Sequence, residues 1–266
     1  MIGKAVDIQT ADGTMDGYAA YPAGNGPFPL VVMFMDIWGL RDELFALARQ
    51  VASHGYYCVV PNLFYRKGKI NFVRRNAAGK MVSFDTLPQE LQAEMQKLGR
   101  DIDRQMVRTD VAAILDFSRN EPVDPGPAGA IGFCLGGRIA FLAAQAFPDR
   151  FRATASLHSV FLVTDAPDSP HRLTARMRGE VYCGYAEHDK FSAPELLAAL
   201  AQSFHGRADL TYRHNLHIGA DHGYSLPDRD VHDAAATAAD WREIVAMFER
   251  TLKPSVKPSA PAPARA

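Results

Sequence analysis

Residues 131–137 read Ile-Gly-Phe-Cys-Leu-Gly-Gly, and this stretch decides the fold. It lies between a short apolar segment and a run of small, helix-forming residues. The pattern G-x-C-x-G at a turn from strand to helix is typical of a nucleophile elbow, where glycines on both sides of the reactive residue avoid steric clashes. The sequence therefore predicts that Cys134 projects over the carboxyl edge of a β-sheet.

Strand-like and helix-like segments alternate on both sides of this turn. After an N-terminal pair of strands over 4–21 that turns at Gly13, the predicted strands are 30–35, 56–60, 128–133, 151–157, 181–185 and 210–214. The predicted helices span 41–54, 101–118 with Asp101 as the cap, 135–147, segments opening at 170 and 194, and a last helix around 241–252. Such alternation indicates a single-domain α/β fold, with a mostly parallel central sheet and helices on both faces.

The domain boundaries follow from where this alternation stops. We expect one α/β domain over residues 1–252. Between 62 and 100 the pattern blurs, which suggests an excursion or lid. The Pro/Ala-rich stretch 253–266 is expected to be disordered.

Bulk composition excludes several function classes. The 266 residues carry a net charge of -1, so neither nucleic acid nor a membrane surface is an expected partner. No signal-peptide or membrane-spanning run is apparent. Three cysteines, at 58, 134 and 183, are too few for a disulfide framework, and we expect a cytoplasmic protein.

A cysteine nucleophile needs a base, because a thiol with an ordinary pKa of about 8.5 is mostly protonated at neutral pH. Enzymes with this elbow order their partners along the chain as nucleophile, acid and histidine. The loop after 181–185 offers Asp189 as the acid, and Glu187 and His188 are rivals that the spacing leaves open. The loop after 210–214 offers His217 and His222, and glycines flank His222.

Several motifs together resemble the dienelactone hydrolase family of α/β hydrolases. They are Gly132–Gly137, Asp36-Ile-Trp-Gly39, Tyr185–Phe191 and Ala220-Asp-His-Gly-Tyr224. The resemblance spans roughly 5–250 and implies a triad of Cys134, His222 and Asp189. It also implies that the backbone N–H groups of Ile37 and Leu135 form an oxyanion hole.

The chain departs from that family pattern at two places. Asp36, near the nucleophile, stands where the best-known members have Glu. Members that act on dienelactone also use an arginine shortly after the histidine, whereas this chain has none before Arg229. The resemblance thus implies hydrolysis of an ester or lactone, but not of dienelactone itself.

The expected function is cleavage of a small-molecule carboxylic ester or lactone through an acyl-enzyme, with no cofactor. A non-catalytic ligand-binding or redox-sensing relative is the alternative. A dinucleotide-binding enzyme is disfavoured, because the motif G-x-G-x-x-G is absent. His214, His217 and His222 lack the companions of a metal site, so we expect no metal.

Two further groups of residues have open roles. A basic stretch runs from Arg66 to Lys80 and would be either a solvated loop or a lid that attracts anionic substrates. Trp38, Phe64 and Tyr65 fall in loops at strand ends. They would line a substrate pocket or pack the lid against the body.

Overall fold

The computed structural model describes residues 1–253, so the stretch expected to be disordered lies outside the described residues except for Lys253. Eight strands form one sheet in the order β1-β2-β4-β3-β5-β6-β7-β8. The β1–β2 and β2–β4 pairs are antiparallel, and all other neighbours are parallel. The strands are β1 Ile2–Thr10, β2 Gly13–Tyr21, β3 Leu30–Phe34, β4 Tyr57–Pro61, β5 Ala128–Phe133, β6 Phe151–Leu157, β7 Gly179–His188 and β8 Leu210–Asp221.

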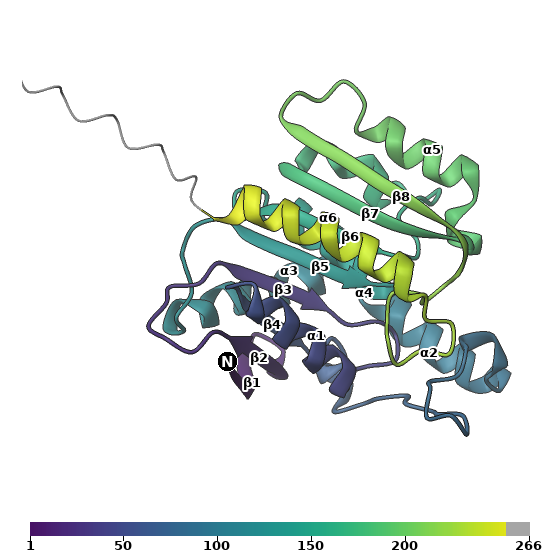
Figure 1. The fold of residues 1–266 in the computed structure, drawn as a ribbon, viewed down its shortest axis with the longest axis horizontal. Coiled ribbons are helices and arrows are strands. Elements are labelled where there is room, and N and C mark those ends of the chain that lie inside the picture. Colours follow the sequence, from purple (N-terminus) through teal and green to yellow (C-terminus); the bar gives the residue numbers. More distant parts are fainter. Residues whose placement is uncertain (254–266) are drawn as a thin grey trace, which may run out of the picture.

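Helices cover both faces of this sheet (Figure 1): α1 and α6 lie on one face, and α3 and α4 lie on the other. The α-helices are α1 Asp42–Ser53, α2 Gln89–Asp101, α3 Arg104–Phe117, α4 Leu135–Ala146, α5 Pro194–Ser203 and α6 Ala234–Leu252. Short 3-10 helices are Tyr65–Lys67, Phe84–Thr86, Ser118–Asn120, Pro170–Arg176 and Lys190–Ser192. The predicted α/β fold class is confirmed.

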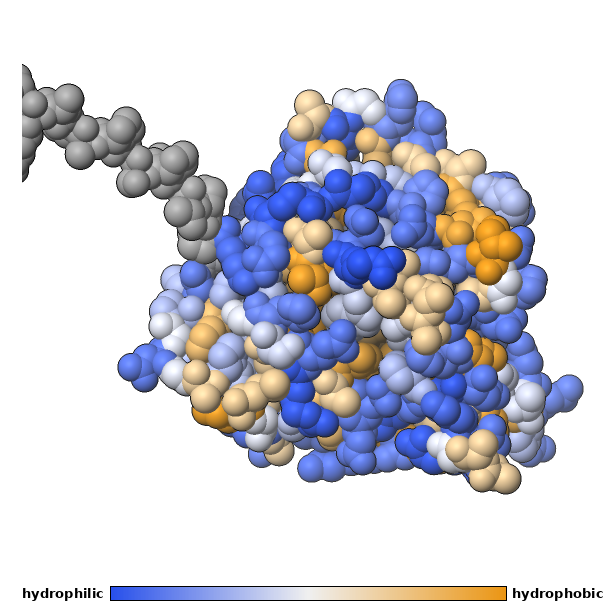
Figure 2. Space-filling view, in the orientation of Figure 1, coloured by the Kyte–Doolittle hydropathy of each residue, from blue (hydrophilic) through white to orange (hydrophobic). Residues whose placement is uncertain are grey.

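The central strands are buried along their whole length. Every residue of β3, β4 and β5 is buried, because helices on both sides shield a parallel sheet from water. The face seen in Figure 2 is mostly hydrophilic, with apolar groups in scattered patches. In residues 1–253, no helix combines the length and apolar content needed to cross a bilayer.

Some element boundaries differ from those the sequence predicts. β8 continues to Asp221, and most of its residues are exposed because it is the edge strand, so no apolar run marks its second half. α2 was not predicted, since only Met95 and Gly99 of its residues are buried. Asp101 ends α2 and does not cap the next helix. Instead, Asp103 caps α3 by accepting the Met106 N–H at 2.7 Å.

Candidate active site

Cys134 lies at the sharp turn between β5 and α4. Its backbone has φ 53° and ψ -114°, a combination that is uncommon for residues other than glycine and that clusters at functional sites. The glycines are required on both sides. A Cβ at Gly132 would lie 2.0 Å from the carbonyl oxygen of Gly136, and a Cβ at Gly136 would lie 2.1 Å from that of Phe34. The elbow expected from the sequence is formed, and its half-buried thiol sits at the N-terminus of α4.

His222 and Asp189 meet above the carboxyl edge of the sheet. The ring Nδ1 of His222 lies 2.6 Å from Oδ2 of Asp189. The other carboxylate oxygen of Asp189 accepts the Phe191 N–H at 3.0 Å. Asp189 follows β7 and His222 follows β8, which are neighbouring strands. The carboxylate therefore fixes the orientation of the imidazole and leaves its Nε2 free for a second partner.

The thiol of Cys134 is close enough to this imidazole to affect its pKa. Burial lowers the pKa of His222, but the charge of Cys134 and hydrogen bonds with Asp189 and Cys134 raise it to about 10. The imidazole of His222 is therefore protonated at neutral pH. Because the pKa is raised in the folded state, this charge stabilises the fold fully below pH ~6.5. The contribution is lost as the pH rises toward 10.

The rival candidates point elsewhere. Glu187 and His188 lie at the end of β7, where Glu187 accepts the N–H of Gly219 at 2.8 Å. His217 lies within β8, and its Nε2 is 2.6 Å from Oδ1 of the buried Asp240. No group of three or more His, Cys, Asp or Glu side chains in the described part of the chain is arranged to hold a metal ion. Of the candidate acids and bases, the structure brings Asp189 and His222 to the thiol.

The side chains of Ile37 and Leu135, the two residues expected to form an oxyanion hole, both pack against Gly99 of α2. A Cβ placed on Gly99 of α2 would be 3.3 Å from Cδ1 of Ile37 and 3.6 Å from Cδ2 of Leu135. Leu135 is the first residue of α4, where a helix leaves its N–H without an internal acceptor. The hydrogen bonds found between described residues give neither N–H an acceptor outside the helices and strands.

Asp36 is held in a buried ion cluster. Its two carboxylate oxygens accept hydrogen bonds from Arg41 Nη1 at 2.7 Å and Nη2 at 3.0 Å. Arg41 also donates from Nε to Oδ2 of Asp228 at 2.6 Å. Burial lowers the pKa of Arg41, but the two carboxylates more than offset this and raise it above its ordinary value. Arg41 thus ties the loop after β3 to the loop after β8.

Replacing Arg41 with methionine is expected to destabilise the fold by about 3–5 kcal/mol, because two buried carboxylates lose their shared cation. Urea unfolding followed by circular dichroism measures this. The matched control is Arg119→Met, which breaks a surface ion pair with Asp116 and should stay close to wild type. Equal losses in the two variants would contradict the role assigned to Arg41.

Arg229 is a buried cation that the sequence spacing did not reveal as part of the site. It is 4% exposed, and its Nε has no hydrogen-bond partner among the described residues. The guanidinium lies 5.0 Å from the ring centre of Trp38. Its Nη1 would be 3.0 Å from a Cβ on Gly223, the residue after His222. The intervening loop folds back through tight turns, so an arginine seven residues away in the chain lies next to the histidine.

His158 was also missed. It follows β6 in the left-handed region, with φ 37°, and its ring centre is 5.0 Å from that of His222. Its Nε2 lies 2.8 Å from Oγ of Ser225. Burial, together with the charges of His222 and Arg229, lowers its pKa well below the ordinary value, so the ring is neutral. Its place at the carboxyl end of a parallel strand is the signal that would have found it.

The aromatic residues expected near the substrate have different surroundings. Trp38 is buried beneath Arg229. Phe64 packs against Phe72 with ring centres 6.4 Å apart, and the hydroxyl of Tyr65 lies 2.9 Å from Oδ1 of Asp110. The contacts of Phe64 and Tyr65 fit the alternative in which they pack the excursion against the body.

The excursion over 62–100 contacts the loop that carries His222. The N–H of Met81 donates to the carbonyl of Asp228 at 2.7 Å, and the N–H of Asp230 donates to the carbonyl of Met81 at 3.0 Å. Some of its basic residues bond to neighbouring groups. Arg66 bonds to Asp12 and Asp110, and Lys80 donates to the carbonyl of Pro227. Arg66 is thus paired with carboxylates, whereas the bond of Lys80 to a carbonyl leaves its charge unpaired among the described residues.

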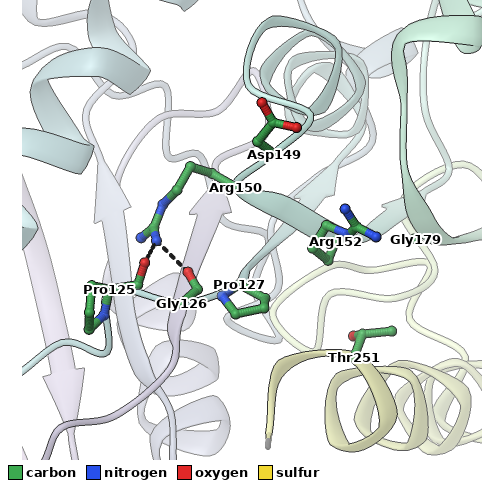
Figure 3. Close-up of a pocket in the computed structure, with 8 residues that line it drawn as sticks. All are labelled: Pro125, Gly126, Pro127, Asp149, Arg150, Arg152, Gly179 and Thr251. Atoms are coloured by element: carbon green, nitrogen blue, oxygen red, sulfur yellow. Dashed lines mark hydrogen bonds between the residues drawn. The ribbon is translucent and has the colours of Figure 1, made fainter.

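A cavity of about 420 Å³ lies at the opposite edge of the sheet (Figure 3). It is lined by Pro125, Gly126, Pro127, Asp149, Arg150, Arg152, Gly179 and Thr251. Most of these residues lie at or just before the starts of β5, β6 and β7, whereas Cys134 follows the end of β5. Arg150 donates to the carbonyls of Pro125 and Gly126. This cavity is separate from the thiol and contains neither a nucleophile nor an imidazole.

A nucleophile elbow over the carboxyl edge of an eight-stranded, mostly parallel sheet defines an α/β hydrolase. The sequence profile of the dienelactone hydrolase family matches residues 15–252, and the chain belongs to this family. It is accordingly a hydrolase of the ester or lactone type.

Similar proteins agree with this membership. A protein of Synechocystis sp., provisionally named a carboxymethylenebutenolidase, is 26% identical over 89% of this chain and 92% of its own. The carboxymethylenebutenolidase of Pseudomonas putida is 27% identical over 56% of this chain and 59% of its own. A crystal structure from Klebsiella pneumoniae, provisionally described as a dienelactone hydrolase, has the same fold. Its TM-score is 0.79 and its identity 20%, covering 94% of this chain and 98% of that one.

Proposed function

We propose that this chain cleaves a carboxylic ester or lactone by acyl transfer through Cys134, His222 and Asp189. The observation that carries this proposal is the 2.6 Å contact between His222 Nδ1 and Asp189 Oδ2, on an imidazole whose pKa the nearby elbow thiol helps to raise. An oriented base next to an activated thiol is the requirement for nucleophilic catalysis.

The first half of the reaction forms an acyl-enzyme. The Cys134 thiolate attacks the carbonyl carbon, and the resulting oxyanion accepts hydrogen bonds from the N–H groups of Ile37 and Leu135. Each donor of this kind is worth about 3–4 kcal/mol in comparable sites. When the C–O bond breaks, protonated His222 gives its Nε2 proton to the departing alkoxide.

The second half regenerates the enzyme. Neutral His222 takes a proton from water, and the hydroxide attacks the thioester carbonyl in the same oxyanion hole. Collapse of this intermediate releases the carboxylic acid and restores the thiolate, and His222 keeps the proton. Asp189 holds the imidazole in the orientation that both steps need. For a lactone, acid and alcohol leave as one molecule.

We further propose that the substrate carries a carboxylate, held by Arg229. A buried guanidinium without a carboxylate partner is costly, and Arg229 lies beside the loop of His222. The name of the Pseudomonas putida relative describes an acid-bearing lactone of this kind. The excursion over 62–100 would act as a lid on the single domain 1–252. The three free cysteines support a cytoplasmic location.

Substitution of Arg229 by glutamine tests the substrate class. We expect the ratio of kcat/KM for a carboxylate-bearing ester to that for its neutral methyl ester to fall about 10- to 100-fold, as for loss of a hydrogen bond to a charged group. Arg229→Lys should restore part of it. The exposed Arg74, changed to glutamine, is the control from the basic stretch. A ratio unchanged in Arg229→Gln but lowered in Arg74→Gln would assign anion binding to the basic stretch.

A further inference from the structure

A small apolar pocket adjoins His222. Residues from the segment after β6 form one wall, and residues from β7, Phe191 and α5 form the rest. Its lining is Ser159, Phe161, Leu162, Val163, Tyr185, Phe191, Leu196, Leu197 and Leu200. Seven of these nine side chains are purely hydrocarbon. The hydroxyls are occupied, since Ser159 bonds to Ser156 and Tyr185 to Tyr212. Such a pocket suits a hydrocarbon group and offers nothing to a charged one.

The pocket is continuous with the reacting groups. The ring centre of Phe191 lies 6.1 Å from that of His222, and the Phe191 N–H bonds to Asp189. On the other wall, the N–H of Val160 donates to the carbonyl of Cys134 at 3.4 Å. A group bound here is therefore within reach of an ester carbonyl placed on the thiol.

Phe161 covers this pocket in an unusual way. It is 44% exposed and has φ 55°, a left-handed conformation that is rare for a bulky residue. Its ring packs edge-on against Phe191, with centres 4.9 Å apart and planes at 72°. The space left inside is about 10 Å³, no more than a single water occupies. A substituent can enter only if a wall moves, and the exposed Phe161 is the wall with room to move.

We propose that this pocket binds an apolar substituent of the substrate, a short alkyl or aromatic group on the acyl or the alcohol side, and that Phe161 swings aside to admit it. This inference rests on the hydrolase function proposed above and adds a second specificity element to Arg229. Each methylene removed from water strengthens binding roughly fourfold, so the pocket selects among esters that react alike.

Two readouts test the pocket in the full chain. The first is the ratio of kcat/KM for a longer ester to that for a shorter one. One pair, p-nitrophenyl hexanoate and p-nitrophenyl acetate, varies the acyl side. The other pair, hexyl acetate and methyl acetate, varies the alcohol side. The second is the rate at which N-hexyl-iodoacetamide alkylates Cys134, divided by the rate for N-methyl-iodoacetamide. Both rates are followed by the intact mass of the protein. The ratio is then divided by the corresponding ratio for glutathione, which corrects for the intrinsic reactivity of the two reagents. Alkylation needs no turnover, so it reports on the pocket even if no ester is hydrolysed.

Three variants are expected to lower, raise and leave unchanged these ratios. Leu197→Trp fills the pocket and should lower the alkylation ratio and at least one ester ratio tenfold or more. Phe161→Ala opens it and should raise the same ratios. Ala198→Trp puts the same bulk on the exposed side of α5 and should leave them unchanged. The ester series that responds identifies the acyl or alcohol side.

The failures of the two proposals can be told apart. Hydrolysis with ratios that neither Leu197→Trp nor Phe161→Ala alters would overturn the pocket and leave the hydrolase function standing. Suppose instead that the wild type hydrolyses no ester, while Leu197→Trp and Phe161→Ala still change the alkylation ratio of Cys134 as expected. That result would overturn the function and support the pocket. If Leu197→Trp does not fold, the exposed Phe161→Ala decides the matter alone.

Discussion

Cys134→Ala is expected to abolish hydrolysis of esters and lactones, lowering kcat roughly 10⁴-fold or more, as removal of a nucleophile does in comparable enzymes. The backbone donors of Ile37 and Leu135 remain, but no atom is left to form the acyl-enzyme. Initial rates with p-nitrophenyl acetate, with the variant purified free of wild type, measure the loss.

The other two cysteines provide the controls. Burial raises the pKa of Cys183 to about 12 and that of Cys58 higher still, so neither is a thiolate at neutral pH. Cys58→Ala and Cys183→Ala should therefore keep the turnover of their folded fraction, and iodoacetamide should label Cys134 first. Normal hydrolysis by Cys134→Ala would refute the nucleophile. A wild type with a reactive Cys134 but no turnover would favour the ligand-binding or redox-sensing alternative.

His222→Gln is expected to cost roughly 10³- to 10⁴-fold in kcat, because the base and the proton donor are lost together. The pH profile carries further information. The pKa of His222 is raised to about 10, so its protonated form, which gives the proton to the leaving group, disappears as the pH rises through that value. In wild type, kcat/KM should fall above pH ~10. In Asp189→Asn, which loses the carboxylate partner, this fall should begin at lower pH.

The rival residues serve as controls for this assignment. Glu187 and His188 lie at the end of β7, and their side chains are largely exposed. The control variants are Glu187→Gln and His188→Gln. We expect both to keep the rate and the alkaline limb of wild type. If Glu187→Gln shifted the limb and Asp189→Asn did not, the acid would have to be reassigned.

The features that the sequence could predict are those set by local sterics or by chain order. Gly132 reveals the elbow because a side chain there would meet the backbone of Gly136, only four residues further along the chain. The apolar runs of β3, β4 and β5 reveal a sheet covered on both faces. Asp189 and His222 could be chosen because each follows a strand, although the chain alone did not exclude Glu187, His188 or His217.

The features that the sequence could not predict depend on long-range folding. Arg229 joins the site only because turns bring it back against Gly223 and Trp38. α2 is mostly polar and buries little, and no side-chain cap marks its start. The boundaries of β7 and β8 extend beyond the apolar runs because the pairing of the two strands, rather than burial, continues them.

The cluster of Arg41, Asp36 and Asp228 has a consequence for how this enzyme could diversify. The loop of His222 is fastened to the loop after β3 through Arg41, and to the excursion through Met81. These three segments are far apart in the gene but mechanically joined. A chimera that grafts one of them from a relative would mismatch the other two. A functional exchange would therefore have to replace all three segments together.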